Sequence, residues 1–231
     1  IEEESFFKNF SDIPIPDKIP LRNITPAMST VVYRLYDPYI TWTPEKHIKY
    51  FDSKKYETTI VEHQEKKLIV IISKTKSSGQ WGKIDDLINI EYDLYIAYLN
   101  EEQKLLYINS SNNSSTHNKL AENLVGSNIT LFNESDIYRS LSGIFQLELF
   151  NLGLKSHLNG PISFTMYSGN GIIKGLDELD KNTMHSSNLF GVGYENGEKI
   201  SIGCSSKGRV WTKLVKTIPD YCDWCDKLGD K

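Results

Sequence analysis

The chain has 231 residues, of which 39% are hydrophobic, 11% aromatic and 24% charged, and its formal net charge is -4 at pH 7. This composition is typical of a globular protein and argues against disorder over most of the chain. No apolar run approaches the roughly 18 to 20 residues of a membrane-spanning helix, which excludes a transmembrane protein, and we expect no membrane partner. The three cysteines cannot form a complete disulfide framework and favour a reducing, cytoplasmic location.

The first thirty residues differ in composition from the rest. They combine three consecutive glutamates, Glu2 to Glu4, with four prolines: Pro14, Pro16, Pro20 and Pro26. Prolines interrupt regular structure, so we expect residues 1–30 to form an extended N-terminal arm or linker. Because the first residue is Ile1, we also expect an excised fragment or a processed product.

Residues 31–110 predict a β-rich subdomain. A β-branched and aromatic run predicts a strand over 31–36, and Thr43 and Pro44 predict the N-cap and first position of a short helix. Two antiparallel hairpins should follow, because β-rich runs flank polar turns in each case. The expected strand pairs are 56–61 with 67–73 and 92–99 with 104–109.

Residues 116–231 predict an α+β subdomain after a polar stretch at 110–115, which marks a plausible boundary within an otherwise continuous domain 31–231. A helix is expected over 117–125. Apolar residues recur three and four apart between Ile137 and Leu152, which predicts a central buried helix. The remaining expected elements are a strand at 162–167, a helix at 172–179, a hairpin of 190–194 with 198–204 across Asn196-Gly197, a strand at 209–214 and a helix at 219–228.

These elements indicate an α+β fold, in which antiparallel hairpins and meanders pack on the central helix and the C-terminal helix.

Patterns that would indicate a cofactor or a complete catalytic site are missing from the sequence. Cys222 and Cys225 have the spacing of half a zinc site, but no second pair accompanies them, and their position on the apolar stripe of the last helix predicts burial in the core. Gly169-Asn170-Gly171 could receive a phosphate, but a tight turn is the preferred interpretation because the dinucleotide fingerprint is incomplete. We therefore expect no metal, no cofactor and no catalytic residues, although a metal-dependent nuclease stays open as an alternative.

The strongest functional signal is local positive charge. Residues 199–219 contain five basic and no acidic side chains, and residues 66–83 repeat this pattern. Cations, hydroxyl groups and exposed amides on a hairpin tip at 205–209 can contact phosphates, and neighbouring tryptophans can stack on unpaired bases. The predicted nucleic-acid-binding residues are Lys199, Ser205, Ser206, Lys207, Arg209, Trp211, Lys213, Lys74, Lys76 and Trp81. A solvated lysine-rich face without function is the competing interpretation.

The same region carries a family resemblance. The segments Ser187 to Gly191, Gly193 to Gly197 and Ile202 to Trp211 resemble the C-terminal region of large bacterial DEAD/DEAH-box helicase-like proteins, several of which are thought to act in defence against phage or foreign DNA. The resemblance extends from about Leu141 to the C-terminus and implies an accessory domain of an ATP-dependent motor.

Together the residues and the resemblance predict a non-catalytic accessory domain that binds nucleic-acid backbone, with DNA a better candidate than RNA. The alternative is a protein-interaction module that docks the helicase motor or a partner subunit through the N-terminal arm and exposed aromatic residues.

Overall fold

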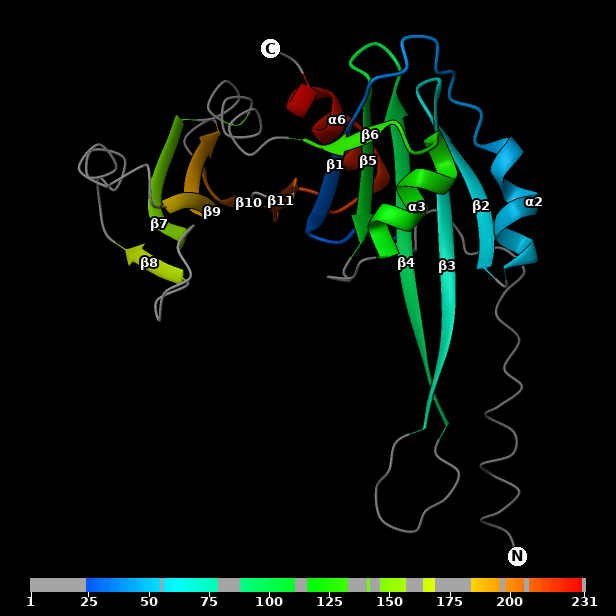
Figure 1. Cartoon of the computed structure of the whole chain (residues 1–231), viewed down its shortest axis with the longest axis horizontal. Helices are drawn as coiled ribbons and strands as arrows, with labels where there is room; N and C mark the ends of the chain where they lie inside the picture. The colour runs from blue at the N-terminus through cyan, green and yellow to red at the C-terminus, as the bar shows by residue number, and fades with distance from the viewer. Residues whose placement is uncertain are drawn as a thin grey trace, which may run out of the picture.

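A computed structural model of the chain describes residues 24–54, 56–78, 88–110, 116–132, 141, 146–156, 164–168, 184–195, 198–205 and 208–229. For 74–78, 88–92, 146–156, 164–168, 184–195 and 198–199 the description is of the backbone. The described strands form one antiparallel sheet of eleven strands in the order β2-β3-β4-β5-β1-β11-β10-β9-β7-β8, with β6 also paired to β1 (Figure 1).

The strands are β1 (Ser29–Leu35), β2 (Tyr56–His63), β3 (Lys66–Ser78), β4 (Ile88–Asn100), β5 (Leu105–Ser110), β6 (Ile129–Leu131), β7 (Gln146–Ser156), β8 (Phe164–Ser168), β9 (Met184–Glu195), β10 (Glu198–Ser205) and β11 (Arg209–Thr212). The described helices are α2 (Glu45–Ser53), α3 (Thr116–Val125) and α6 (Ile218–Gly229). None of the helices in the described ranges is long and apolar enough to cross a membrane.

The middle of the sheet is buried on both faces, which explains the continuous apolar runs of β3, β4 and β5. Leu68, Val70 and Ile96 belong to a core with Tyr221 and Trp224 of α6. The alternate residues of the same strands belong to a second core, which also contains Phe51 of α2 and Leu120 of α3: Ile69, Ile71, Ala97, Leu106 and Ile108. The sheet is therefore the middle of three layers, with α2 and α3 on one face and α6 on the other.

The α+β fold class is confirmed, and so are both early hairpins, the pairing of β9 with β10, the short helix α3 and the C-terminal helix. Local signals placed these elements correctly because each hairpin closes over a short turn. In the β2–β3 turn, Gln64 and Glu65 both have positive φ, and in the β4–β5 turn Lys104 does. Such turns match the natural twist of paired strands.

The predicted central helix is wrong over its second half. Residues from Gln146 onward form β7, which pairs with β9 and β8. Leu147 and Leu149 alternate with polar residues, and after a register shift between Leu149 and Asn151 the alternation resumes at Leu152. A strand with two register shifts thus produces apolar spacings of two and three, which overlap the helical pattern. Leu141 is helical and only 2% exposed.

Two boundaries also differ from expectation. The first strand begins at Ser29 rather than at residue 31, so the final two residues of the predicted arm belong to the sheet. The helix α2 begins at Glu45, with Pro44 rather than Thr43 at the N-cap and without a side-chain capping hydrogen bond. Residues 1–23, the predicted turn at 169–171 and the predicted helix at 172–179 lie outside the described residues.

The strand β1 joins the two predicted subdomains, because it hydrogen-bonds β5 on one side and β11 on the other. The helix α6 adds a second connection: the Tyr221 hydroxyl donates to the carbonyl oxygen of Ile96 in β4, at 3.3 Å. Residues of both predicted subdomains therefore share one sheet and one core. The boundary proposed at 110–115 falls largely outside the described residues and stays a prediction.

Candidate nucleic-acid interface

The two described residues that flank the β10–β11 turn, Ser205 and Gly208, are buried, and Gly208 packs against β1. Ser205 is only 6% exposed, and its carbonyl oxygen accepts a hydrogen bond from the amide of Gly208 at 3.1 Å. The carbonyl oxygen of Gly208 in turn accepts from the amide of Val32 at 2.8 Å. The expectation that Ser205 offers an exposed hydroxyl to a phosphate is therefore wrong, while Ser206 and Lys207 lie outside the described residues.

Gly208 is required by this packing. Its φ is +66°, in the left-handed region that residues with a Cβ rarely adopt. A Cβ at this position would lie 2.8 Å from the carbonyl oxygen of Val32 and 3.3 Å from the amide nitrogen of Phe132. The glycine in the Lys-Gly-Arg segment thus serves the close approach of two backbones.

The strand β11 has one buried and one partly exposed side. Val210 and Thr212 are buried, at 1% and 3% exposure, whereas Arg209 and Trp211 are half-buried and alternate with them. Arg209 lies opposite Val31 in β1, which places it on the sheet face that carries α2 and α3. The prediction that Arg209 and Trp211 share one face is confirmed, and exposed Lys213 follows directly after the strand.

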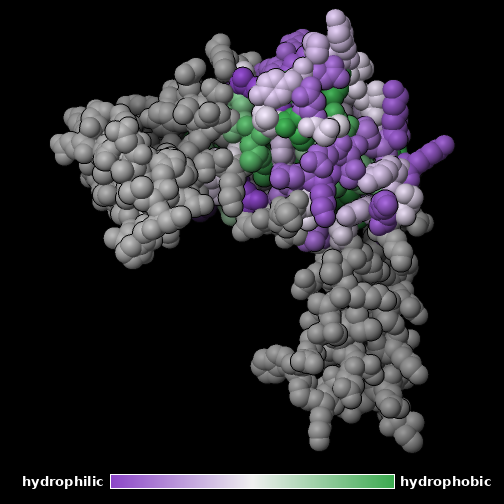
Figure 2. Space-filling view, viewed as in Figure 1, coloured by the Kyte–Doolittle hydropathy of each residue, from purple (hydrophilic) through white to green (hydrophobic). Residues whose placement is uncertain are grey.

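The neighbouring strand β10 shows the same asymmetry. Ile200, Ile202 and Cys204 are buried in the core beneath α6, whereas Ser201 is exposed. Within the described residues, β10 and β11 contribute no side chain to the apolar core beneath α2 and α3. We call Ser201, Arg209, Trp211 and Lys213 the β10–β11 face. Figure 2 shows that hydrophilic residues dominate the described surface in that view, with hydrophobic residues between them.

Arg209 lies near Tyr33 of β1, which itself contacts α3. The Tyr33 hydroxyl, on β1, donates to Oδ1 of Asn118 in α3 at 2.7 Å. Burial raises the pKa of Tyr33, and the positive charge of Arg209 opposes this shift. Burial also lowers the pKa of Arg209 itself. The Arg209 side chain is therefore partly buried.

The other predicted residues lie at several places in the fold. Lys199 is in β10 opposite Tyr194, while Lys74 and Lys76 are in β3 opposite Tyr92 and Ile90. Trp81 lies outside the described residues. Four strand steps separate β3 from β11, or about 19 Å at 4.8 Å per step. The long β3–β4 hairpin also extends beyond the helices (Figure 1), so in the described strands the backbone of Lys74 and Lys76 lies away from Arg209 and Trp211 in β11.

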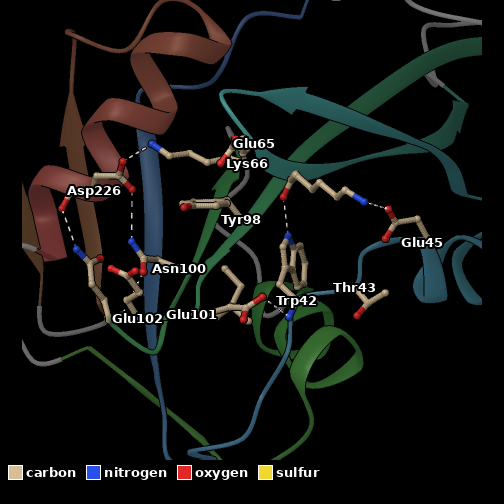
Figure 3. A pocket seen from close by; sticks show the side chains of 13 residues that line it. Trp42, Thr43, Glu45, Glu65, Lys66, Tyr98, Asn100, Glu101, Glu102 and Asp226 are labelled. Atoms are coloured by element: carbon tan, nitrogen blue, oxygen red, sulfur yellow. Dashed lines mark hydrogen bonds and ion pairs between the residues drawn. The ribbon is translucent and has the colours of Figure 1, made fainter.

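A groove of about 630 Å³ lies at one end of the sheet, where the β2–β3 and β4–β5 turns meet α2 and α6 (Figure 3). Five carboxylates and two lysines line it, a difference of three negative charges. Both lysines are paired: Lys66 with Asp226, and Lys67 with Glu45 at 2.5 Å. The full set of lining residues is Trp42, Thr43, Glu45, Glu65, Lys66, Lys67, Tyr98, Leu99, Asn100, Glu101, Glu102, Gln103 and Asp226.

The groove was not predicted from sequence, because its residues come from four separate segments. Trp42 joins its own segment to two of the others. Its indole nitrogen donates to the carbonyl oxygen of Lys67 at 2.5 Å, and its amide donates to Oε1 of Glu101 at 2.8 Å. The excess of carboxylates repels phosphate groups. A polyanion is therefore accommodated better by the β10–β11 face than by this groove.

Cys222 and Cys225 lie in the core as predicted, and Cys204 is buried too. Cys204 is 1% exposed, and Cys222 and Cys225 are fully buried. Burial raises the pKa of Cys222 to about 11 and also raises that of Cys225, which favours neutral thiols. Over the described part of the chain, no group of three or more histidine, cysteine or acidic side chains is placed to hold a metal ion.

No protein-family model matches the chain, and no curated protein matches it. The relation to helicase-like proteins stays a prediction from the sequence segments quoted above.

Proposed function

We propose that the chain is a nucleic-acid-binding domain and that the β10–β11 face contacts the sugar-phosphate backbone. The observation that carries the proposal is the alternation in β11, where the side chains facing α6 are buried and those facing the other way include Arg209 and Trp211. Arg209 and Trp211 are partly exposed, so this side of β11 can contact a ligand.

The charge of this face fits a polyanion. Arg209 and Lys213 add two cations, and Ser201 is an exposed hydroxyl that can donate to a phosphate oxygen. The five basic residues between 199 and 219 are accompanied by no acidic residue, in contrast to the groove at the end of the sheet. The overall charge of -4 does not oppose this interaction, because binding depends on the local field.

The test is fluorescence anisotropy with a labelled DNA oligonucleotide over a range of salt concentrations. Arg209→Glu/Lys213→Glu should lower affinity by about tenfold or more and reduce the slope of log K against log salt by about 1.4, or 0.7 for each lost phosphate contact on a single strand. Because Arg209 also lies beside Tyr33, Lys213→Glu alone is measured as a second variant, and circular dichroism verifies that both variants are folded.

The matched control is Lys46→Glu/Lys49→Glu, which makes the same charge change at exposed positions of α2. It should leave both affinity and salt slope close to those of the unchanged protein. Equal losses in the two double variants would show that only total charge matters, and unchanged binding by Arg209→Glu/Lys213→Glu would refute the proposed interface.

A further inference from the structure

The groove at one end of the sheet has the size of a small-molecule site. Its volume of about 630 Å³ lies within the range of about 300 to 1,000 Å³ that is usual for such sites. The hydrogen bonds of Trp42 join three of its segments, and Nε2 of Gln103 donates to the carbonyl oxygen of Asp226 in α6 at 3.1 Å. The walls of the groove are therefore held in place by tertiary contacts.

The lysines of the groove are already paired, whereas three of its carboxylates are not. Lys66 pairs with Asp226, and Lys67 pairs with Glu45 at 2.5 Å. The other three acidic side chains are exposed, and no basic group of the described residues forms an ion pair with them: Glu65, Glu101 and Glu102. The negative charge of the groove is therefore only partly compensated by its own residues.

These carboxylates are spread along the groove and do not form a metal site. Glu65 is in the β2–β3 turn, whereas Glu101 and Glu102 are in the β4–β5 turn. Nowhere in the described ranges are three or more acidic, histidine or cysteine side chains placed to hold a metal ion. Figure 3 shows the rings of Tyr98 and Trp42 between Glu65 and Glu101. A matching ligand is an organic cation with an apolar stem rather than a bare ion.

Trp42 can contact the stem of such a ligand. The indole stacks on His47, with ring centroids 6.1 Å apart, and Trp42 also lines the groove. Burial lowers the pKa of His47, and nearby Lys46 adds to this shift, so the imidazole is neutral at pH 7 and does not compensate the carboxylates. An indole attracts organic cations through its ring face, in addition to the attraction of the carboxylates.

The backbone of the β2–β3 turn does not require a glutamate at its tip. Gln64 and Glu65 have φ angles of 48° and 67°, which glycine adopts at lower cost than a residue with a Cβ. The Glu65 carboxylate is thus present at a conformational cost that no contact among the described residues explains.

We infer that the groove binds a small organic cation, a guanidinium or alkylammonium group on an aliphatic stem, with its charge at the carboxylates and its stem against Trp42. The groove and the β10–β11 face share no residue, so this inference does not depend on the proposed function. An arginine side chain of a peptide and a free polyamine both have this chemistry.

Isothermal titration calorimetry of the full chain with N-acetylargininamide, spermidine and Mg²⁺ distinguishes these sources. At least one organic cation should bind saturably, with a dissociation constant of about 1 mM or below. A preference for N-acetylargininamide identifies a peptide side chain as the ligand, and a preference for spermidine identifies a polyamine. No saturable binding of either up to about 10 mM, or equal affinity for Mg²⁺, overturns the inference.

Glu101→Gln/Glu102→Gln removes two charges and keeps an oxygen that can accept from the Trp42 amide. Affinity should fall about 2- to 30-fold, the range for losing two exposed ion pairs. The matched control is Glu57→Gln/Glu122→Gln, which makes the same charge change at exposed positions outside the groove and should leave affinity unchanged. Equal losses in the two double variants would show that only net charge matters and would overturn the site.

Glu65→Gly separates binding from stability, because the two should change in opposite directions. Affinity should fall by up to about 5-fold, while the melting temperature stays the same or rises, since glycine adopts the φ of 67° more readily. A loss of affinity in this variant therefore cannot result from unfolding. Unchanged affinity would overturn the placement of the ligand between the two turns.

Discussion

Gly208→Ala tests whether the loop between β10 and β11 depends on close backbone packing. The substitution places a Cβ at a φ of +66°, which costs about 1 to 2 kcal/mol for a residue other than glycine. The Cβ would also lie 2.8 Å from the carbonyl oxygen of Val32, which belongs to a central strand and has little freedom to move. Relieving that contact endangers the hydrogen bond from Val32 to Gly208, worth about 1 kcal/mol.

A reduced entropy of the unfolded chain offsets about 0.4 to 1 kcal/mol of these losses. The net decrease in the free energy of unfolding should therefore be about 1 to 3 kcal/mol. The assay is urea unfolding followed by circular dichroism, in which the midpoint should fall while the slope with urea stays the same.

Gly126→Ala provides the matched control. Gly126 also has a positive φ, +87°, but a Cβ there would meet no atom within 4 Å. Its substitution should cost only the conformational part, about 1 kcal/mol. If the two variants lose the same stability, the contact with Val32 does not determine the choice of glycine, and the argument for a tightly packed loop is refuted.

Two further predictions concern α6. Because burial raises the pKa of Cys222 from near 9 to about 11, its contribution to stability is complete below pH 9 and is lost as the pH rises to 11, by about 3 kcal/mol. Cys222→Ala should reduce the decline in stability over this pH range, and an unchanged decline in urea unfolding would contradict the assignment. The Lys66–Asp226 pair, whose side chains are 22% and 32% exposed, should show a coupling of about 0.5 to 1 kcal/mol in a double-mutant cycle with Lys66→Met and Asp226→Asn. This coupling should shrink in high salt, and a coupling that is independent of salt would exclude an ionic origin.

Local features of the sequence determined the elements that close over short distances. The β2–β3 and β9–β10 hairpins follow from β-rich runs around compact turns, and the apolar stripe of α6 placed Cys222 and Cys225 in the core. The alternation of Arg209 and Trp211 on one strand face is also local, because successive residues of a strand point to opposite sides. Each of these features is determined by residues that are close to one another in the chain, so it can be predicted from the sequence alone.

The tertiary structure decided everything that depends on distant partners. The segment 146–156 is a strand because β9 and β8 are present to pair with it, although its leucines fit a helix nearly as well. Ser205 and Gly208 are buried because β1 lies against their loop, which no nearby residue indicates. Which side of β11 enters the core depends on α6, because Val210 packs in the core that contains α6, while the described core beneath α2 and α3 contains no residue of β11. Burial is a property of the whole packed arrangement, and periodicity within one segment reveals alternation but not which side is covered.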